Sequence, residues 1–102
     1  MNLTFSSAAQ TDLTASMLFY ETQSEGLGTR FLASVYETCS NLRLFPNAGR
    51  IAFDDLRKMK VARFPFGVVY RVEHTEIVVY AVVDLRRDPE RIESDLSRLE
   101  DE

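Results

Sequence analysis

Two consecutive arginines follow the most apolar stretch of the chain and are the first candidates for a functional site. Residues 77–83 read IVVYAVV, with no charged side chain, and Arg86 and Arg87 come three residues later. Paired guanidinium groups at the end of a strand can bind carboxylate or phosphate groups. Asp84, just upstream, lowers the local positive field. A simpler interpretation is a buried strand that ends in solvent, with Asp88 and Pro89 starting a helix.

A second group of basic residues lies in the middle of the chain. Seven of the twelve lysine and arginine residues fall between residues 43 and 71, although the whole chain has a net charge of −4. The acidic total disfavours non-specific binding to nucleic acids, whereas the basic middle leaves room for a polyanion site. The same bases could equally form the solvated face of a strand.

Other reactive residues are scarce. The one histidine, His74, falls in a polar connection, and the one cysteine, Cys39, falls on the apolar stripe of a predicted helix. We therefore expect a turn residue and a buried structural thiol. One histidine and one cysteine are too few for a protein-only zinc site, so no metal or cofactor is expected. Phe64 and Phe66 could stack on a nucleobase but are better explained as core residues.

Length and composition favour one small domain. The chain has 102 residues, 45% of them apolar, without repeats or linkers, and we expect a single domain over residues 1–102. It contains no apolar run of about 18 residues that could span a membrane. Its first residues lack the basic and apolar regions of a secretory signal. A single cysteine fits a reducing cytoplasm.

The first half of the chain has the periodicity of two helices. Residues 8–24 place apolar side chains three to four apart, and Ser6 or Ser7 can cap the start. Gly26 and Gly28 suit a tight connection between antiparallel helices. Residues 28–45 form a second amphipathic stretch, which Pro46 ends.

The second half has the signals of strands. Strands are expected at residues 3–5, 58–64, 68–72 and 77–83, the last central and buried on both faces. Residues 47–55 read as a loop, 65–67 as a turn, 73–76 as a polar connection and 89–100 as a short charged helix, followed by a tail. The order is β-α-α-β-β-β-(α), an α+β fold with two antiparallel helices packed on a small, mostly antiparallel sheet.

Three stretches resemble a known family. They are DLTASMLFYETQSEGLGTRF (12–31), LFPNAGR (44–50) and LRKMKVARFPFGVVYRVEHTEIVVYAVVDLRRDP (56–89). They are similar to the RelE/ParE superfamily of type II toxin–antitoxin toxins, over about residues 8–92. The resemblance is closest to the ParE-like, plasmid-stabilisation branch, whose β-α-α-β-β-β order agrees with the periodicity.

The resemblance implies a small prokaryotic toxin that a cognate antitoxin neutralises by wrapping around it in a hetero-oligomer. ParE-like toxins inhibit DNA gyrase by binding and perform no bond chemistry. In that case we expect the target-binding residues to be basic: Arg50, Arg57, Arg63, Arg71, Arg86 and Arg87.

The resemblance leaves two alternatives open. A RelE-like toxin would cleave mRNA on the ribosome, and its catalytic residues here would be Lys58, Lys60, Arg63 and Arg86. The family's late aromatic is replaced by Ile92, an arginine of the third strand by Gly67, and a histidine near the end of the last strand by Asp84. These departures favour binding of a target over cleavage of RNA. We therefore expect a binding protein rather than an enzyme. The second alternative is a degenerate member that only binds an antitoxin.

Overall fold

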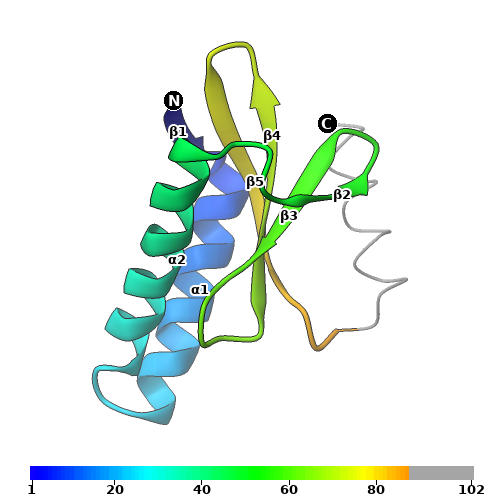
Figure 1. The fold of residues 1–102 in the computed structure, drawn as a ribbon. Coiled ribbons are helices and arrows are strands. Elements are labelled where there is room, and N and C mark those ends of the chain that lie inside the picture. Colours follow the sequence, from blue (N-terminus) through cyan, green and yellow to red (C-terminus); the bar gives the residue numbers. More distant parts are fainter. Residues whose placement is uncertain (88–102) are drawn as a thin grey trace.

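The computed structural model describes residues 1–87, which form two helices on one face of a five-stranded sheet (Figure 1). The elements are β1 (Asn2–Phe5), α1 (Ser7–Gln23), α2 (Leu27–Leu44), β2 (Arg50–Phe53), β3 (Leu56–Lys60), β4 (Phe66–Glu73) and β5 (Glu76–Asp84). The predicted α+β fold is confirmed. The predicted helix at 89–100 and the position of Ile92 lie outside the described residues. No helix within residues 1–87 is both long and apolar enough to cross a bilayer.

The two helices begin and end within one residue of their predicted positions. The Ser6 hydroxyl caps α1 by accepting a hydrogen bond from the Ala9 N–H at 3.1 Å. Gly26 adopts φ 84° between the helices, and the Glu21 carboxylate accepts hydrogen bonds from the N–H groups of Gly26 and Gly28 at 2.9 Å each. These contacts fix the tight antiparallel connection, because they satisfy N–H groups that the start of α2 leaves without helical partners.

The sheet has the strand order β1-β5-β4-β3-β2. β1 runs parallel to β5, and the other pairs are antiparallel. The predicted interior position of β5 is confirmed, because it pairs with β1 on one side and β4 on the other. Its burial on both faces is also confirmed: Ile77 and Val79 pack in the core beneath the helices, whereas Ala81 and Val83 belong to a second cluster.

Three predicted boundaries in the second half were wrong. The predicted loop 47–55 contains β2, which is short and irregular, with a register shift between Ile51 and Phe53. Turn-forming residues lie on both sides of this strand, namely Asn47, Gly49, Asp54 and Asp55. Their signals hid a strand of four residues, so the whole stretch was predicted as a loop. β3 covers 56–60 rather than 58–64, because the chain turns at residues 62–65, where Arg63 has φ 69°. Phe66 and Gly67, predicted as part of a turn, begin β4.

The larger core lies between the helices and the sheet. The rings of Tyr20 and Phe31 pack edge-on against those of Phe64 and Phe66, with ring centroids 5.0–5.9 Å apart. Tyr20 and Phe31 also contact each other, in a tilted arrangement with centroids 5.2 Å apart. The core role expected of the two phenylalanines is thereby confirmed. Cys39 is also buried, as predicted, and burial raises the pKa of its thiol to about 11.

Tyr70 holds the segment before β2 against the sheet. This fully buried side chain donates a hydrogen bond to the Pro46 carbonyl at 2.7 Å and accepts one from the Gly49 N–H at 2.9 Å. The segment after α2 is therefore anchored from β4, although it carries turn residues.

Candidate functional site

Arg86 and Arg87 lie in a tight turn directly after β5. The Leu85 N–H donates to the Pro65 carbonyl at 2.8 Å, and the Arg87 N–H donates to the Asp84 carbonyl at 3.2 Å. The first bond ties the turn to the β3–β4 connection, and the second closes the turn itself. Both arginines are therefore held close to the end of the sheet.

Asp84 binds Arg86 through both oxygens. Oδ1 accepts from the Arg86 backbone N–H and from Nε, each at 2.9 Å, and Oδ2 accepts from a terminal guanidinium nitrogen at 2.7 Å. The hydrogen bonds from the Arg86 side chain hold the pKa of the Asp84 carboxyl below its usual value, and the same bonds raise the pKa of Arg86. The two hydrogen bonds between the carboxylate and the guanidinium group fix the orientation of the Arg86 side chain and neutralise part of its charge.

A pocket of about 330 Å³ opens between α1 and this turn. Its wall contains two cations, two carboxylates, one hydroxyl and four apolar side chains, namely Asp12, Ala15, Ser16, Phe19, Phe66, Val82, Asp84, Arg86 and Arg87. The Phe19 ring is half exposed. The Asp12 carboxylate accepts a hydrogen bond from the Val82 N–H at 3.1 Å, which joins α1 to β5.

The neighbouring Tyr20 is kept neutral. Burial raises the pKa of its hydroxyl, and the nearby positive charge of Arg86 offsets part of that effect. A raised pKa disfavours the ionised form of Tyr20, the form that would accept a proton. The pocket itself offers two cations beside the half-exposed ring of Phe19.

The structure places the other predicted bases away from this pocket. Arg57 donates to the carbonyls of Asn47 and Gly49, the latter at 2.7 Å, so it supports the loop before β2. Arg71 pairs with Asp55 at 2.9 Å and lies 5.5 Å from the centre of the Tyr80 ring.

The remaining predicted bases lie along β2, β3 and the β3–β4 turn. Arg63 is 3.8 Å from the Glu37 carboxylate in an exposed pair. Lys60 donates to two backbone carbonyls of the same turn. Arg50 and Lys58 face each other in register across β2 and β3. Arg86 and Arg87, two of the predicted target-binding residues, both border the pocket at the end of β5.

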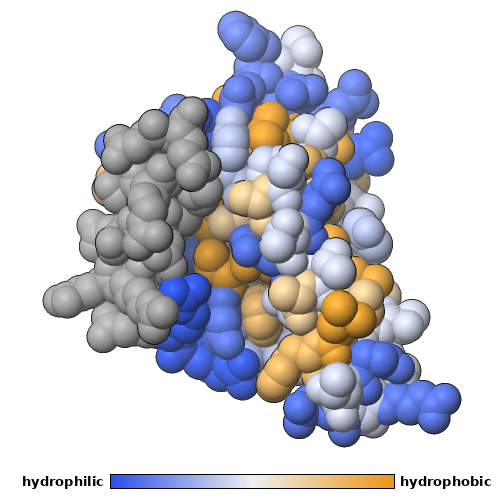
Figure 2. Space-filling view, turned by 180° about the vertical axis from the view of Figure 1, so that it is seen from behind, coloured by the Kyte–Doolittle hydropathy of each residue, from blue (hydrophilic) through white to orange (hydrophobic). Residues whose placement is uncertain are grey.

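Sequence reasoning missed Asp12 and Phe19. Asp12 is one acid among many on a helix, and nothing local indicates that it reaches β5. Phe19 did carry a signal, because a large aromatic residue lies off the apolar stripe of α1. Exposed hydrophobic surface is not confined to this site, however, and Figure 2 shows several patches on the face behind the view of Figure 1.

His74, as predicted, lies in a turn, where it has φ 53° between β4 and β5.

Comparisons with known proteins agree with this fold. The family described as "ParE toxin of type II toxin-antitoxin system, parDE" matches residues 3–89. A solved structure titled "Chromosomal ParDE TA system from P. aeruginosa" superposes with a TM-score of 0.72 at 23% identity, covering 83% of this chain and 96% of that one. No curated protein matches the chain. The family match covers most of the sequence, and the chain therefore belongs to the ParE toxin family of type II toxin–antitoxin systems.

Proposed function

We propose that this chain is a toxin that inhibits DNA gyrase by binding to it and that a cognate antitoxin neutralises it. The observation that carries this proposal is the pocket at the end of β5, where Arg86 and Arg87 lie beside the half-exposed ring of Phe19. Arginine and aromatic side chains are enriched in protein interfaces. The match to the ParE toxin family and the fold shared with a ParDE structure support the same proposal.

The groups around the pocket favour binding over cleavage. Cleavage of RNA needs a group that takes a proton and cations that face the phosphate. Both pocket carboxylates, Asp12 and Asp84, already accept hydrogen bonds from the chain. Lys60, one of the four bases expected of a ribonuclease, donates to backbone carbonyls, while Arg63 and Arg86 pair with carboxylates.

A gyrase inhibitor of this family implies a partner, a cellular location and a biological role. The antitoxin is the partner that the family implies, and gyrase places the toxin in the cytoplasm. A toxin and antitoxin of this kind would stabilise the plasmid or chromosomal segment that carries them. The two form a hetero-oligomer in which the toxin is inactive.

Purified chain and purified DNA gyrase test the target directly. We expect the wild-type chain to inhibit supercoiling of relaxed plasmid and to leave mRNA intact in a cell-free translation reaction. The double variant Arg86→Ala/Arg87→Ala should lose about tenfold or more of the inhibition while remaining folded, with only the small loss of stability that removal of the Arg86–Asp84 pair brings.

The matched control is Arg30→Ala, which removes one exposed arginine from α2 and should inhibit as wild type does. Full inhibition by the double variant would show that the strand-end pocket is not the contact. Cut mRNA with normal supercoiling would replace gyrase with the ribosome as the target.

A further inference from the structure

The far face of the sheet, turned away from both helices, carries the second apolar cluster of the protein. This far-face cluster consists of Leu56, Val69, Ala81 and Val83, which are between 0% and 7% exposed. Within residues 1–87, both helices lie on the opposite face, and no other helix is available to cover this one (Figure 1). An apolar sheet face needs a cover, because large exposed apolar patches are rare on monomeric soluble proteins.

Side chains of the sheet itself cover part of the far-face cluster. A Cβ atom at Gly67 would lie 3.1 Å from Cγ of Lys58 and 3.2 Å from Cδ2 of Leu85, so these two side chains lie across the backbone there. Tyr80 also packs against the cluster, but both Tyr80 and Leu85 are only partly buried. The cover that these side chains give is therefore incomplete.

Basic side chains border the far-face cluster. Arg50 faces Lys58 in register across β2 and β3, and Arg71, which pairs with Asp55, lies 5.5 Å from the centre of the Tyr80 ring. Residues 43–71, which contain these three bases, carry seven bases and two acids, a net charge of +5. The far face therefore suits a partner that combines apolar side chains with carboxylates.

The chain continues beyond the described residues with a segment of that composition. Residues 88–102 contain seven acids and two bases, a net charge of −5. Ile92, Leu96 and Leu99 are spaced four and three residues apart, a spacing that gathers them on one side of a helix. The segment thus carries both an apolar stripe and the charge opposite to that of the basic strands.

The segment also has the starting point and the length to cross the far face. It follows the turn after β5, and β5 is separated from β2 by three strand spacings. At about 4.8 Å each, these spacings amount to about 14 Å. A helix over residues 89–100 would be about 18 Å long, enough to reach β2.

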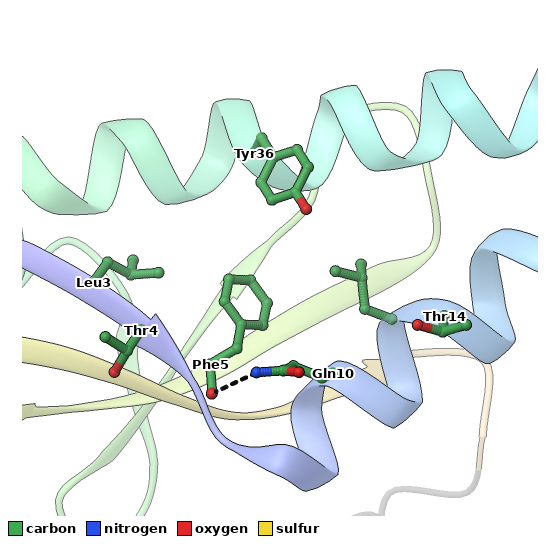
Figure 3. Close-up of a pocket in the computed structure, with 7 residues that line it drawn as sticks. Leu3, Thr4, Phe5, Gln10, Thr14 and Tyr36 are labelled. Atoms are coloured by element: carbon green, nitrogen blue, oxygen red, sulfur yellow. Dashed lines mark hydrogen bonds between the residues drawn. The ribbon is translucent and has the colours of Figure 1, made fainter.

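The groove on the helix side of the sheet suits this segment less well. Its volume is about 530 Å³, and it lies between β1, α1 and α2. Figure 3 shows the Tyr36 side chain descending from α2 on the opposite side of the groove from Gln10. None of the residues that line the groove is acidic or basic. It therefore offers no counter-charge to the acids of the segment.

We propose that residues 88–102 form an intramolecular cover on the far face of the sheet. Its apolar stripe packs on the far-face cluster, and its carboxylates lie beside Arg50 and Lys58. The cover withholds these two bases from anionic partners. This inference goes beyond the proposed function, because it concerns another face of the protein and does not depend on the identity of the target.

A nitroxide spin label on Ser97→Cys locates the segment in the full chain. Residue 97 lies off the stripe of Ile92, Leu96 and Leu99, so the label replaces no apolar contact. Cys39 is buried with a thiol pKa of about 11, which directs the label to residue 97. We expect the amide NMR signals of β3 and β4 to broaden and those of α2, on the opposite face, to keep their intensity.

The contrary outcomes of this measurement are distinct. Broadening confined to β1, α1 or α2 would place the segment on the helix side and overturn the proposal. Signals that keep their intensity throughout the sheet would overturn it as well. A mixture of spin-labelled chains with isotope-labelled chains that lack the nitroxide tests for a second copy. Broadening in that mixture would identify the second copy as the occupant, which also contradicts an intramolecular cover.

A pair of variants tests whether the segment withholds the bases. Leu96→Asp and Ser97→Asp add the same charge at neighbouring positions, but only the first lies in the apolar stripe. With a fluorescent single-stranded RNA as the polyanion probe, we expect Leu96→Asp to bind about threefold more tightly than wild type at low salt, despite its added negative charge. Ser97→Asp should bind no more tightly than wild type, and adding Lys58→Ala to Leu96→Asp should remove the gain.

Unchanged or weaker RNA binding by folded Leu96→Asp would overturn the proposal, because the added charge alone predicts that result. A gain that survives Lys58→Ala would show that the segment does not cover this base, and it would overturn the proposal too. If Leu96→Asp does not fold, the spin-label measurement still decides, since that chain keeps Leu96.

Discussion

Asp84 and Arg86 form a closed pair at the end of β5, with the carboxylate bound to the guanidinium at 2.7 and 2.9 Å and to the backbone N–H at 2.9 Å. The pair is built from residues two apart, so a turn rather than a distant element sets its geometry. It holds Arg86 at the wall of the pocket and gives that cation an internal counter-ion. The charge that the strand-end site presents to a partner is therefore set largely by Asp84.

Replacing Asp84 by Asn should raise the affinity of the site for polyanions. Asn keeps an oxygen for the Arg86 N–H but removes the negative charge. With a fluorescent single-stranded RNA as the probe, we expect Asp84→Asn to bind about threefold more tightly than wild type at low salt, an advantage that fades as salt rises. Fluorescence anisotropy at two salt concentrations measures this.

The control is Asp55→Asn, which removes the carboxylate partner of Arg71 and changes the net charge equally. If both variants gain the same affinity, total charge rather than the strand-end site explains the effect. Adding Arg86→Ala to Asp84→Asn should return binding to the wild-type level.

The Asp84 pair should also contribute to stability in a pH-dependent way. The folded-state pKa of Asp84 lies below its unfolded value, because Arg86 hydrogen bonds favour the ionised carboxylate. The contribution is thus fully present above the unfolded pKa, about 4, and disappears as pH falls through the folded pKa. Urea unfolding should show that Asp84→Asn is less stable than wild type at pH 7 and that the difference shrinks below pH of about 4. A constant difference would contradict this origin.

Cys39 should be unreactive in the folded protein. Its thiol is buried and its pKa is raised to about 11, so little thiolate exists near neutral pH. We expect a thiol reagent such as Ellman's reagent to label the native chain at pH 8 at least about a hundredfold more slowly than the chain in urea. Labelling at equal rates would show that Cys39 is accessible and not a core residue.

Gly28 should be intolerant of a side chain because of close packing between the helices. A Cβ atom at Gly28 would lie 2.6 Å from the Met17 carbonyl oxygen, which is backbone and cannot move aside. Gly28→Ala should therefore lower the free energy of unfolding by about 2–3 kcal/mol. At Gly26 a Cβ meets nothing within 4 Å, but φ is 84°, so Gly26→Ala should cost about 1 kcal/mol. Urea unfolding compares the two, and a larger loss at Gly26 would refute the steric argument.

Elements whose signals are local could be predicted from the amino-acid sequence. The two helices follow from apolar side chains three to four apart, from the Ser6 cap and from Gly26, all of which act within a few residues. The strands β4 and β5 follow from runs of β-branched and aromatic residues. The family resemblance rested on the same stretches, and the family match over residues 3–89 confirms it.

Features that depend on contacts between distant residues could not be predicted from local patterns. β2 is a strand because β3 pairs with it, although its own four residues lie among turn formers. Asp12 and Phe19 join Arg86 and Arg87 at one pocket because α1 packs against the end of β5, about 70 residues later in sequence. The pairing of Arg71 with Asp55, and the edge position of β1, likewise depend on the order in which the strands assemble. Local propensity fixes a backbone segment, but hydrogen bonds and packing between remote segments decide which charged side chains remain available at a surface.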